Sequence, residues 1–98
     1  MFLAMVTSLA ELRKEIEVVS LEILRLCGER LKLARKIGEI KARKGLPIEI
    51  PNAEEALRKK MLEACQTFGV DDDFTVRLLD LLLLESKRAQ NEMLKKES

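Results

Sequence analysis

An apolar residue recurs at alternating steps of three and four positions along the first half of this chain. The recurrence predicts one uninterrupted helix over residues 8–43, which Thr7 or Ser8 can cap, with Glu11 completing a capping box. A helix of roughly 35 residues is about 53 Å long, whereas a compact domain of this size is about 30 Å across. The chain therefore cannot cover its own first helix, and we expect a homodimer in which two such helices pack together. The repeating residues are Leu9, Leu12, Ile16, Val19, Ile23, Leu26, Leu33, Ile37 and Ile40.

The remainder of the chain predicts two shorter helices. The stretch "KGLPIEIPN" is a loop because it holds a glycine and two prolines, and Asn52 at its end is a suitable cap for a helix over 52–68. Three consecutive aspartates then cap a helix over 72–95. A composition of 47% hydrophobic but only 3% aromatic residues favours Leu-rich helices over a sheet. We therefore expect a single all-α domain over residues 1–98, with three helices per chain.

Several classes of function are excluded by what the chain lacks. It has no His, and Cys27 and Cys65 lie in apolar helical patterns without metal-ligand spacing, so we expect two buried thiols, no metal and no cofactor. A net charge of +1 argues against nucleic-acid binding. The opening "MFLAMVTSLA" lacks a basic segment and is too short to cross a bilayer. We therefore expect a cytoplasmic protein that does not bind membranes.

Polar residues interrupt the apolar stripes of the predicted helices. Arg30 stands where the first repeat requires an apolar residue, and Lys41 follows eleven positions later on the same face. Ser86 and Gln90 interrupt the stripe of the third helix, and Glu54 precedes the stripe of the second. Because buried polar groups cost several kcal/mol unless they are paired, the set predicts one polar site with excess positive charge, suited to an anionic ligand.

Each of these residues also has an ordinary structural explanation. Arg30 could form an ion pair across a dimer interface, or extend its head to water. Ser86 and Gln90 could satisfy each other within a core. Lys41 could be a solvated charge near a helix end, and Glu54 could simply complement the helix dipole. Taken singly, none of them identifies a function.

Taken together, these residues resemble the all-helical chorismate mutases. The resemblance covers nearly the whole chain and rests on "LAELRKEIEVVSLEILRLCGERLKLARKIGEIK", on Glu54 and on "LLLESKRAQ". It implies a chorismate mutase-type domain in an intertwined helical homodimer. It also implies an isomerase that rearranges chorismate to prephenate in aromatic amino-acid biosynthesis, without a cofactor. That intramolecular reaction suits a chain without His, because it needs no nucleophile, metal or proton shuttle.

The resemblance also implies a role for each polar residue. Arg30 would bind a substrate carboxylate, and Ser86 would assist. Lys41 would donate to the ether oxygen and to a carboxylate, and Gln90 would face the same ether oxygen. Glu54 would bind the ring hydroxyl.

Arg13 would enter the site from the partner subunit. Geometry supports this independently, because Arg13 precedes Arg30 by 17 residues, which is about 25 Å along a helix. Taken singly, Arg13 is an ordinary solvated arginine. In an antiparallel dimer, however, Arg13 of one chain can reach the site of the other.

Two positions depart from the family pattern. The family commonly has an acid in the loop and an arginine directly before the glutamate of the second helix, where this chain has Ile50 and Ala53. Glu49 and Arg58 are the candidates to replace them. The stretch "IPNAEEAL" is also similar to the isochorismate-pyruvate lyases, which share the fold. A lyase and a non-catalytic helical dimerisation module therefore stand as alternatives.

Overall fold

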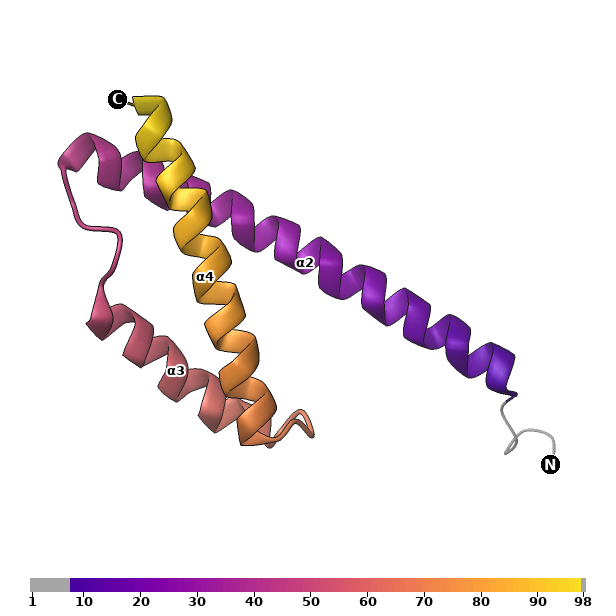
Figure 1. Ribbon diagram of the computed structural model, residues 1–98. Helices are drawn as coiled ribbons and strands as arrows, with labels where there is room; N and C mark the ends of the chain where they lie inside the picture. The colour runs from indigo at the N-terminus through magenta and orange to yellow at the C-terminus, as the bar shows by residue number, and fades with distance from the viewer. Residues whose placement is uncertain (1–7, 98) are drawn as a thin grey trace. The chain divides into compact units, whose positions relative to one another are not determined.

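The computed structural model describes residues 8–97, and their regular secondary structure is entirely helical. Helix α2 spans Leu9–Lys44, α3 spans Pro51–Cys65 and α4 spans Asp72–Glu97 (Figure 1). The prediction of an all-α chain with a very long first helix is confirmed. The chain divides into two compact units, with the division within α2 between Arg30 and Leu31, and each is described by itself.

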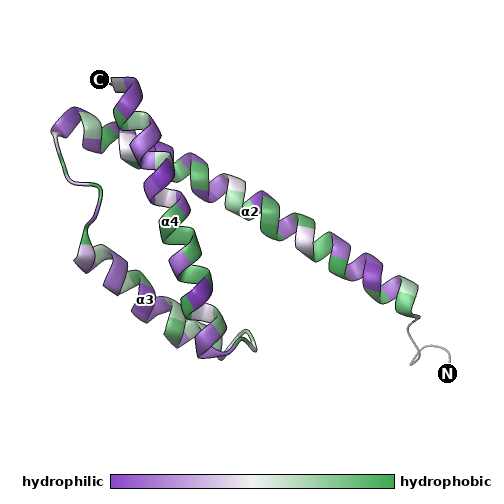
Figure 2. Ribbon diagram, in the orientation of Figure 1, coloured by the Kyte–Doolittle hydropathy of each residue, from purple (hydrophilic) through white to green (hydrophobic). Residues whose placement is uncertain are grey.

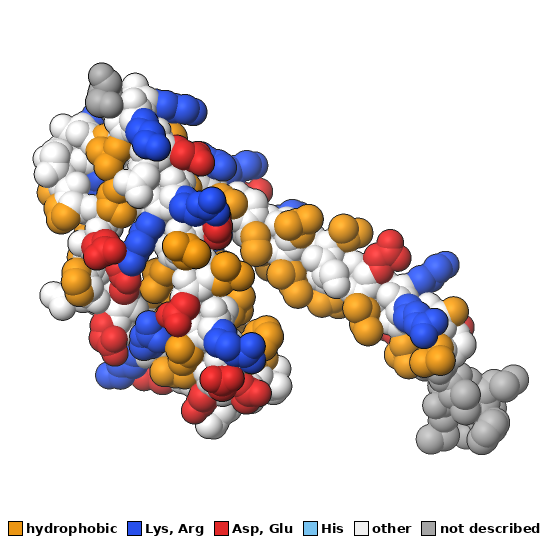
Figure 3. Space-filling view, in the orientation of Figure 1, with side chains coloured by type: hydrophobic (Ala, Val, Ile, Leu, Met, Phe, Trp, Pro, Cys, Tyr) orange, Lys and Arg blue, Asp and Glu red, His pale blue; other side chains and the backbone are white. Residues whose placement is uncertain are grey.

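The first unit is the N-terminal part of α2. Ser8 caps it as predicted, because the Ser8 Oγ accepts a hydrogen bond from the Glu11 backbone N at 3.1 Å; Thr7, the other candidate, lies outside the described residues. Hydrophobic side chains follow this helix along the face seen in Figure 3 and alternate with hydrophilic residues in Figure 2. They are exposed in the single chain, as the length of the helix predicts. The large ones are Leu9, Leu12, Ile16, Val18, Val19, Leu21, Ile23, Leu24 and Leu26.

The second unit begins with the C-terminal part of α2, which a glycine terminates. Gly45 has a φ of +66°, a conformation that costs glycine little. The turn lets the Leu46 N donate to the Lys41 carbonyl at 2.9 Å, the hydrogen bond of a Schellman motif. The loop that follows runs to Ile50, and α3 begins at the next residue, Pro51.

The predicted cap of α3 is wrong by two residues. Ile50, not Asn52, is the N-cap residue, and it makes no side-chain capping bond. Pro51 takes the first helical position, since its fixed φ suits that position and its missing N–H would have no partner there. Helix α3 also ends at Cys65 rather than near residue 68.

The chain leaves α3 through tight turns and enters α4 through a strong cap. Gly69, with a φ of +71°, allows the Val70 N to donate to the Cys65 carbonyl at 2.9 Å. The Asp71 carboxylate then accepts from the Phe74 N at 2.7 Å, so the cap predicted within the aspartate run is confirmed. These turns place α3 against α4.

The core of the second unit is small and contains one close backbone contact. Cys65 is buried as predicted, whereas Cys27 of the first unit is partly exposed; both are free thiols. A Cβ added at Gly38 would lie 2.8 Å from the Gln90 Cα, so α2 and α4 approach closely only because residue 38 has no side chain. The buried apolar residues are Ala34, Cys65, Leu79, Ala89 and Met93.

We expect Gly38→Ala to lower the free energy of unfolding by about 1–3 kcal/mol, because the added methyl group meets backbone rather than a movable side chain. Gly28→Ala is the matched control. Gly28 is also helical but has no atom within 4 Å of an added Cβ, so the higher helix propensity of alanine should stabilise it by about 1 kcal/mol. Urea unfolding of both variants measures the difference. Equal stability of the two would contradict the close contact.

Candidate functional site

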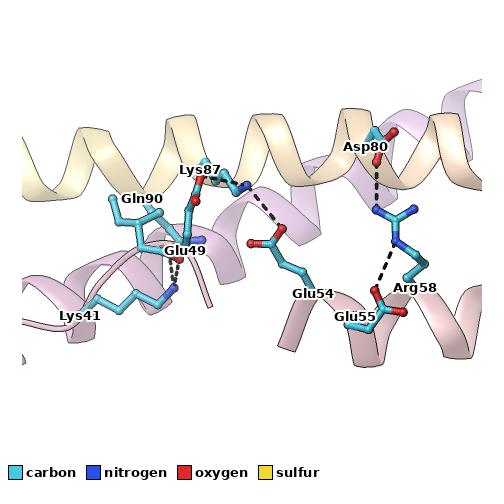
Figure 4. Close-up of polar contacts among 9 residues, drawn as sticks. Lys41, Glu49, Glu54, Glu55, Arg58, Asp80, Lys87 and Gln90 are labelled. Carbon is cyan, nitrogen blue, oxygen red and sulfur yellow. Dashed lines mark hydrogen bonds and ion pairs between the residues drawn. The ribbon is translucent and has the colours of Figure 1, made fainter. Parts of the chain in front are cut away.

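A buried lysine connects three segments of the second unit. The side chain of Lys41, on α2, is 8% exposed. Its Nζ donates one hydrogen bond of 2.7 Å to the Ile48 carbonyl in the loop and another of 2.7 Å to the Gln90 Oε1 on α4 (Figure 4). The structure thus brings together Lys41 and Gln90, two of the residues singled out by the sequence.

The hydrogen bond to Lys41 orients the Gln90 amide. An ammonium group has no lone pair and cannot accept a hydrogen bond, so it must face the amide oxygen. The Gln90 Nε2 is therefore directed away from Lys41 as a donor. An ammonium also carries three protons, and Ile48 and Gln90 accept two of them. Lys41 and Gln90 together can offer hydrogen-bond donors to a ligand oxygen.

The environment of Lys41 is unfavourable for a charged ammonium group. Burial lowers the pKa of Lys41 from the ordinary lysine value, and the negative charge of Glu54 opposes part of that shift. Within residues 8–97, every buried side-chain nitrogen or oxygen has a hydrogen-bond partner. Pairing therefore maintains the buried cation, and a nearby acid assists it.

One cation, Lys87, pairs with two acidic side chains, Glu54 on α3 and Glu49 in the loop. The Lys87 Nζ, on α4, lies 3.4 Å from a Glu54 carboxylate oxygen and 3.3 Å from one of Glu49. Burial opposes the charge of Lys87, but the hydrogen bonds and charges of the two glutamates outweigh it and raise the pKa of Lys87. Lys87 was not among the residues that the sequence singled out. Its position directly after Ser86 and three residues before Gln90 was the available signal.

Ser86 lies on the face of α4 that carries Gln90. The two residues are four positions apart, so their side chains are neighbours along the helix, and both are buried. The Gln90 oxygen accepts a hydrogen bond from Lys41, so Gln90 has a partner on another helix.

Arg58 is engaged elsewhere along α3 and α4. Its guanidinium lies 3.3 Å from an Asp80 carboxylate oxygen and 3.9 Å from one of Glu55 (Figure 4). The structure therefore does not place Arg58 in the ion pairs of Glu54. Ile50 and Ala53 form the start of α3, where the Ala53 N donates to the Ile50 carbonyl at 3.0 Å.

The two remaining candidates belong to the first unit. Arg13 is exposed and Arg30 is partly exposed, and both lie on α2. Their separation of 17 residues along one helix amounts to about 25 Å. Within one chain, Arg13 and Arg30 therefore cannot hold the same small molecule.

Comparison with known proteins identifies the family to which this chain belongs. The model of the family described as chorismate mutase type II matches residues 12–91. A chorismate mutase of Methanocaldococcus jannaschii is 32% identical over 90 residues, which cover 92% of this chain and 91% of that protein. The chain belongs to the chorismate mutase type II family.

Two further relatives are longer proteins. A bifunctional chorismate mutase/prephenate dehydratase of Aquifex aeolicus is 54% identical over 54 residues, which cover 55% of this chain and 15% of the relative. A T-protein of Enterobacter agglomerans is 33% identical over 88 residues, which cover 90% of this chain and 24% of the relative. No solved structure matches the chain.

Two kinds of feature are absent from the described residues. No helix within residues 8–97 combines the length and apolar character needed to span a membrane. Across the same residues, no group of three or more His, Cys, Asp or Glu is arranged to hold a metal ion. The polar group centred on Lys41 and Gln90 is the candidate site of this chorismate mutase family member.

Proposed function

We propose that this chain rearranges chorismate to prephenate, as an isomerase of aromatic amino-acid biosynthesis. The observation that carries the proposal is the buried Lys41 ammonium hydrogen-bonded to the Gln90 amide. Membership of the chorismate mutase type II family supports it. Two of the relatives, those of Methanocaldococcus jannaschii and Aquifex aeolicus, carry chorismate mutase in their names.

The reaction needs donors at one atom of the substrate. As the carbon–oxygen bond of chorismate breaks, the ether oxygen gains negative charge. Donors that are already aimed at this atom stabilise the transition state more than the ground state. Lys41 and Gln90 supply a charged and a neutral donor from one buried place, where the effective dielectric constant is low. We therefore assign the ether oxygen to this pair.

The remaining residues hold the substrate in its compact conformer. By the family resemblance, Arg30 binds one carboxylate of the dianion, since a guanidinium binds carboxylates bidentately. Lys41 also donates to a carboxylate, and Ser86 assists carboxylate binding. Glu54 accepts from the ring hydroxyl, and Arg13 enters from the partner subunit to bind the substrate. Fixing both ends of the substrate removes much of the entropic part of the barrier.

The homodimer is part of the proposal. The first unit leaves its apolar stripe exposed in the single chain, with Leu9 68% and Ile16 65% exposed. Apolar side chains repeating at steps of three and four are suited to packing against a second helix. A partner chain would cover this stripe and supply Arg13. The two free cysteines suit a reducing compartment, so we place the protein in the cytoplasm.

We expect the purified protein to consume chorismate, measured as loss of its absorbance, and to form prephenate, scored as phenylpyruvate after acidification. Arg30→Ala should lower kcat/KM by about 10²–10³-fold, because it removes a charged carboxylate ligand. Arg25→Ala, which removes an exposed arginine paired with Glu22 on the same helix, is the matched control and should keep wild-type activity.

If the protein does not consume chorismate, the further results distinguish the two alternative functions. Inactivity on chorismate with release of pyruvate from isochorismate would identify the lyase. Inactivity on both substrates, with an intact dimer in the wild type and in Arg30→Ala, would identify a non-catalytic dimerisation module.

Mixing two inactive variants tests the contribution of the partner. If Arg13 acts across the dimer, Arg13→Ala and Arg30→Ala chains refolded together should recover about a quarter of wild-type activity, because about half of the dimers are mixed and each mixed dimer holds one intact site. Each variant refolded alone is the control. No recovery in mixtures shown to contain mixed dimers would mean that Arg13 acts within its own chain or not at all.

A further inference from the structure

Lys87 connects α4 to two acidic side chains from two other segments. Its ammonium lies between Glu49, in the loop before α3, and Glu54, in the first turns of α3. The Lys87 and Glu54 side chains are only 30% and 28% exposed. An ion pair that is partly shielded from water is weakened less by solvent than one on an open surface.

Most ion pairs described in this chain are of another kind. Arg25 with Glu22 and Arg77 with Asp73 are pairs three or four residues apart on one helix, with all four side chains more than half exposed. Such exposed pairs contribute little to the free energy of unfolding of a protein. The Lys87–Glu54 pair instead fixes a partly buried carboxylate relative to α4, and Glu49, whose side chain is 71% exposed, is a second and more solvated partner of the same ammonium.

Both glutamates are connected to residues of the candidate site. Glu49 directly follows Ile48, whose carbonyl accepts a hydrogen bond from Lys41. Lys87 precedes Gln90 by three residues, so the two side chains are neighbours on α4. Glu54 acts electrostatically on Lys41. A single ammonium therefore links the substrate-binding acid to the helix face that carries Gln90.

We propose that Lys87 is a positioning residue, which holds the Glu54 carboxylate in place to accept the hydroxyl of the substrate and is itself held by Glu49. The inference rests on the proposed function, since it concerns the same site. It assigns to Lys87 the role of the cation beside Glu54. Ala53 has no charged group for that role, and Arg58 is engaged with Asp80.

The role follows from the geometry of the pair. A glutamate side chain has three rotatable bonds, and ordering it on binding a substrate loses conformational freedom. Lys87 orders the Glu54 carboxylate before the substrate arrives, so that less freedom is lost on binding. A carboxylate has two oxygens that each accept hydrogen bonds, so pairing with Lys87 leaves acceptor capacity for a hydroxyl group.

The test is the steady-state kinetics of chorismate consumption by Lys87→Met, which keeps the length of the side chain but removes its charge. We expect KM to rise about tenfold, with a smaller change in kcat, because an ordered acceptor for a ground-state contact is lost. Lys87→Arg should restore KM to within about threefold of wild type, since a guanidinium can pair with both glutamates. In a Glu54→Gln background, Lys87→Met should change KM by less than about twofold, because the group through which it acts is gone.

Asp80→Asn is the matched control for a merely structural role. It breaks the Arg58–Asp80 pair, which also joins α3 to α4 at 3.3 Å and whose arginine is 31% exposed. We expect wild-type KM and kcat from this variant. The proposal would be overturned by an unchanged KM in Lys87→Met, by an equal rise in Asp80→Asn, or by an undiminished effect in the Glu54→Gln background. These results all require an active wild type, so failure of the proposed function is seen separately, as absence of wild-type turnover.

Discussion

The hydrogen bonds of the Lys41 ammonium to the Ile48 carbonyl and the Gln90 oxygen organise the second unit. They join the end of α2, the loop before α3 and the face of α4. Burying an ammonium is unfavourable, and the lowered pKa of Lys41 records that burial. A close-packed apolar group in its place would stabilise a fold equally well or better. The proposed role in binding the ether oxygen of chorismate would account for a cation kept at this buried position.

Other features of the sequence serve this interaction. Gly38 allows α4 to approach α2 at Gln90, and Gly45 ends α2 so that the loop can return to Lys41. The ion pairs of Lys87 then hold the loop and α3 against α4. In the proposed reaction, this preorganisation is the catalytic contribution of the protein, because donors that need no rearrangement stabilise a developing charge most effectively.

Much of this architecture could be predicted from the sequence, because helical periodicity and caps are local signals. The predicted start and end of the first helix differ from Leu9 and Lys44 by one residue each, and Lys41, Ser86 and Gln90 were recognisable as polar residues within apolar stripes. The start of α3 was missed because Asn52 is a typical capping residue, whereas the helix uses Pro51 at its first position and Ile50, which has no capping side chain, as its N-cap residue. Lys87 was missed because a lysine beside an arginine is typical of a solvated surface. Its two partners lie 38 and 33 residues earlier in the chain, and only the packing of α3 on α4 brings them together.

The measurement that tests this account most directly is the rate of chorismate rearrangement by the double variant Lys41→Met/Gln90→Leu, with its unfolding followed in parallel. Both replacements are apolar and similar in size to the residues they replace, which limits the loss of packing, although the Ile48 carbonyl loses its donor. The unfolding measurement therefore establishes that the variant is folded under the conditions of the assay. If the pair exists for the ether oxygen, the rate should fall by about 10³-fold or more. A folded double variant that retained a rate within about tenfold of the wild type would contradict the assignment of this pair as the catalytic centre.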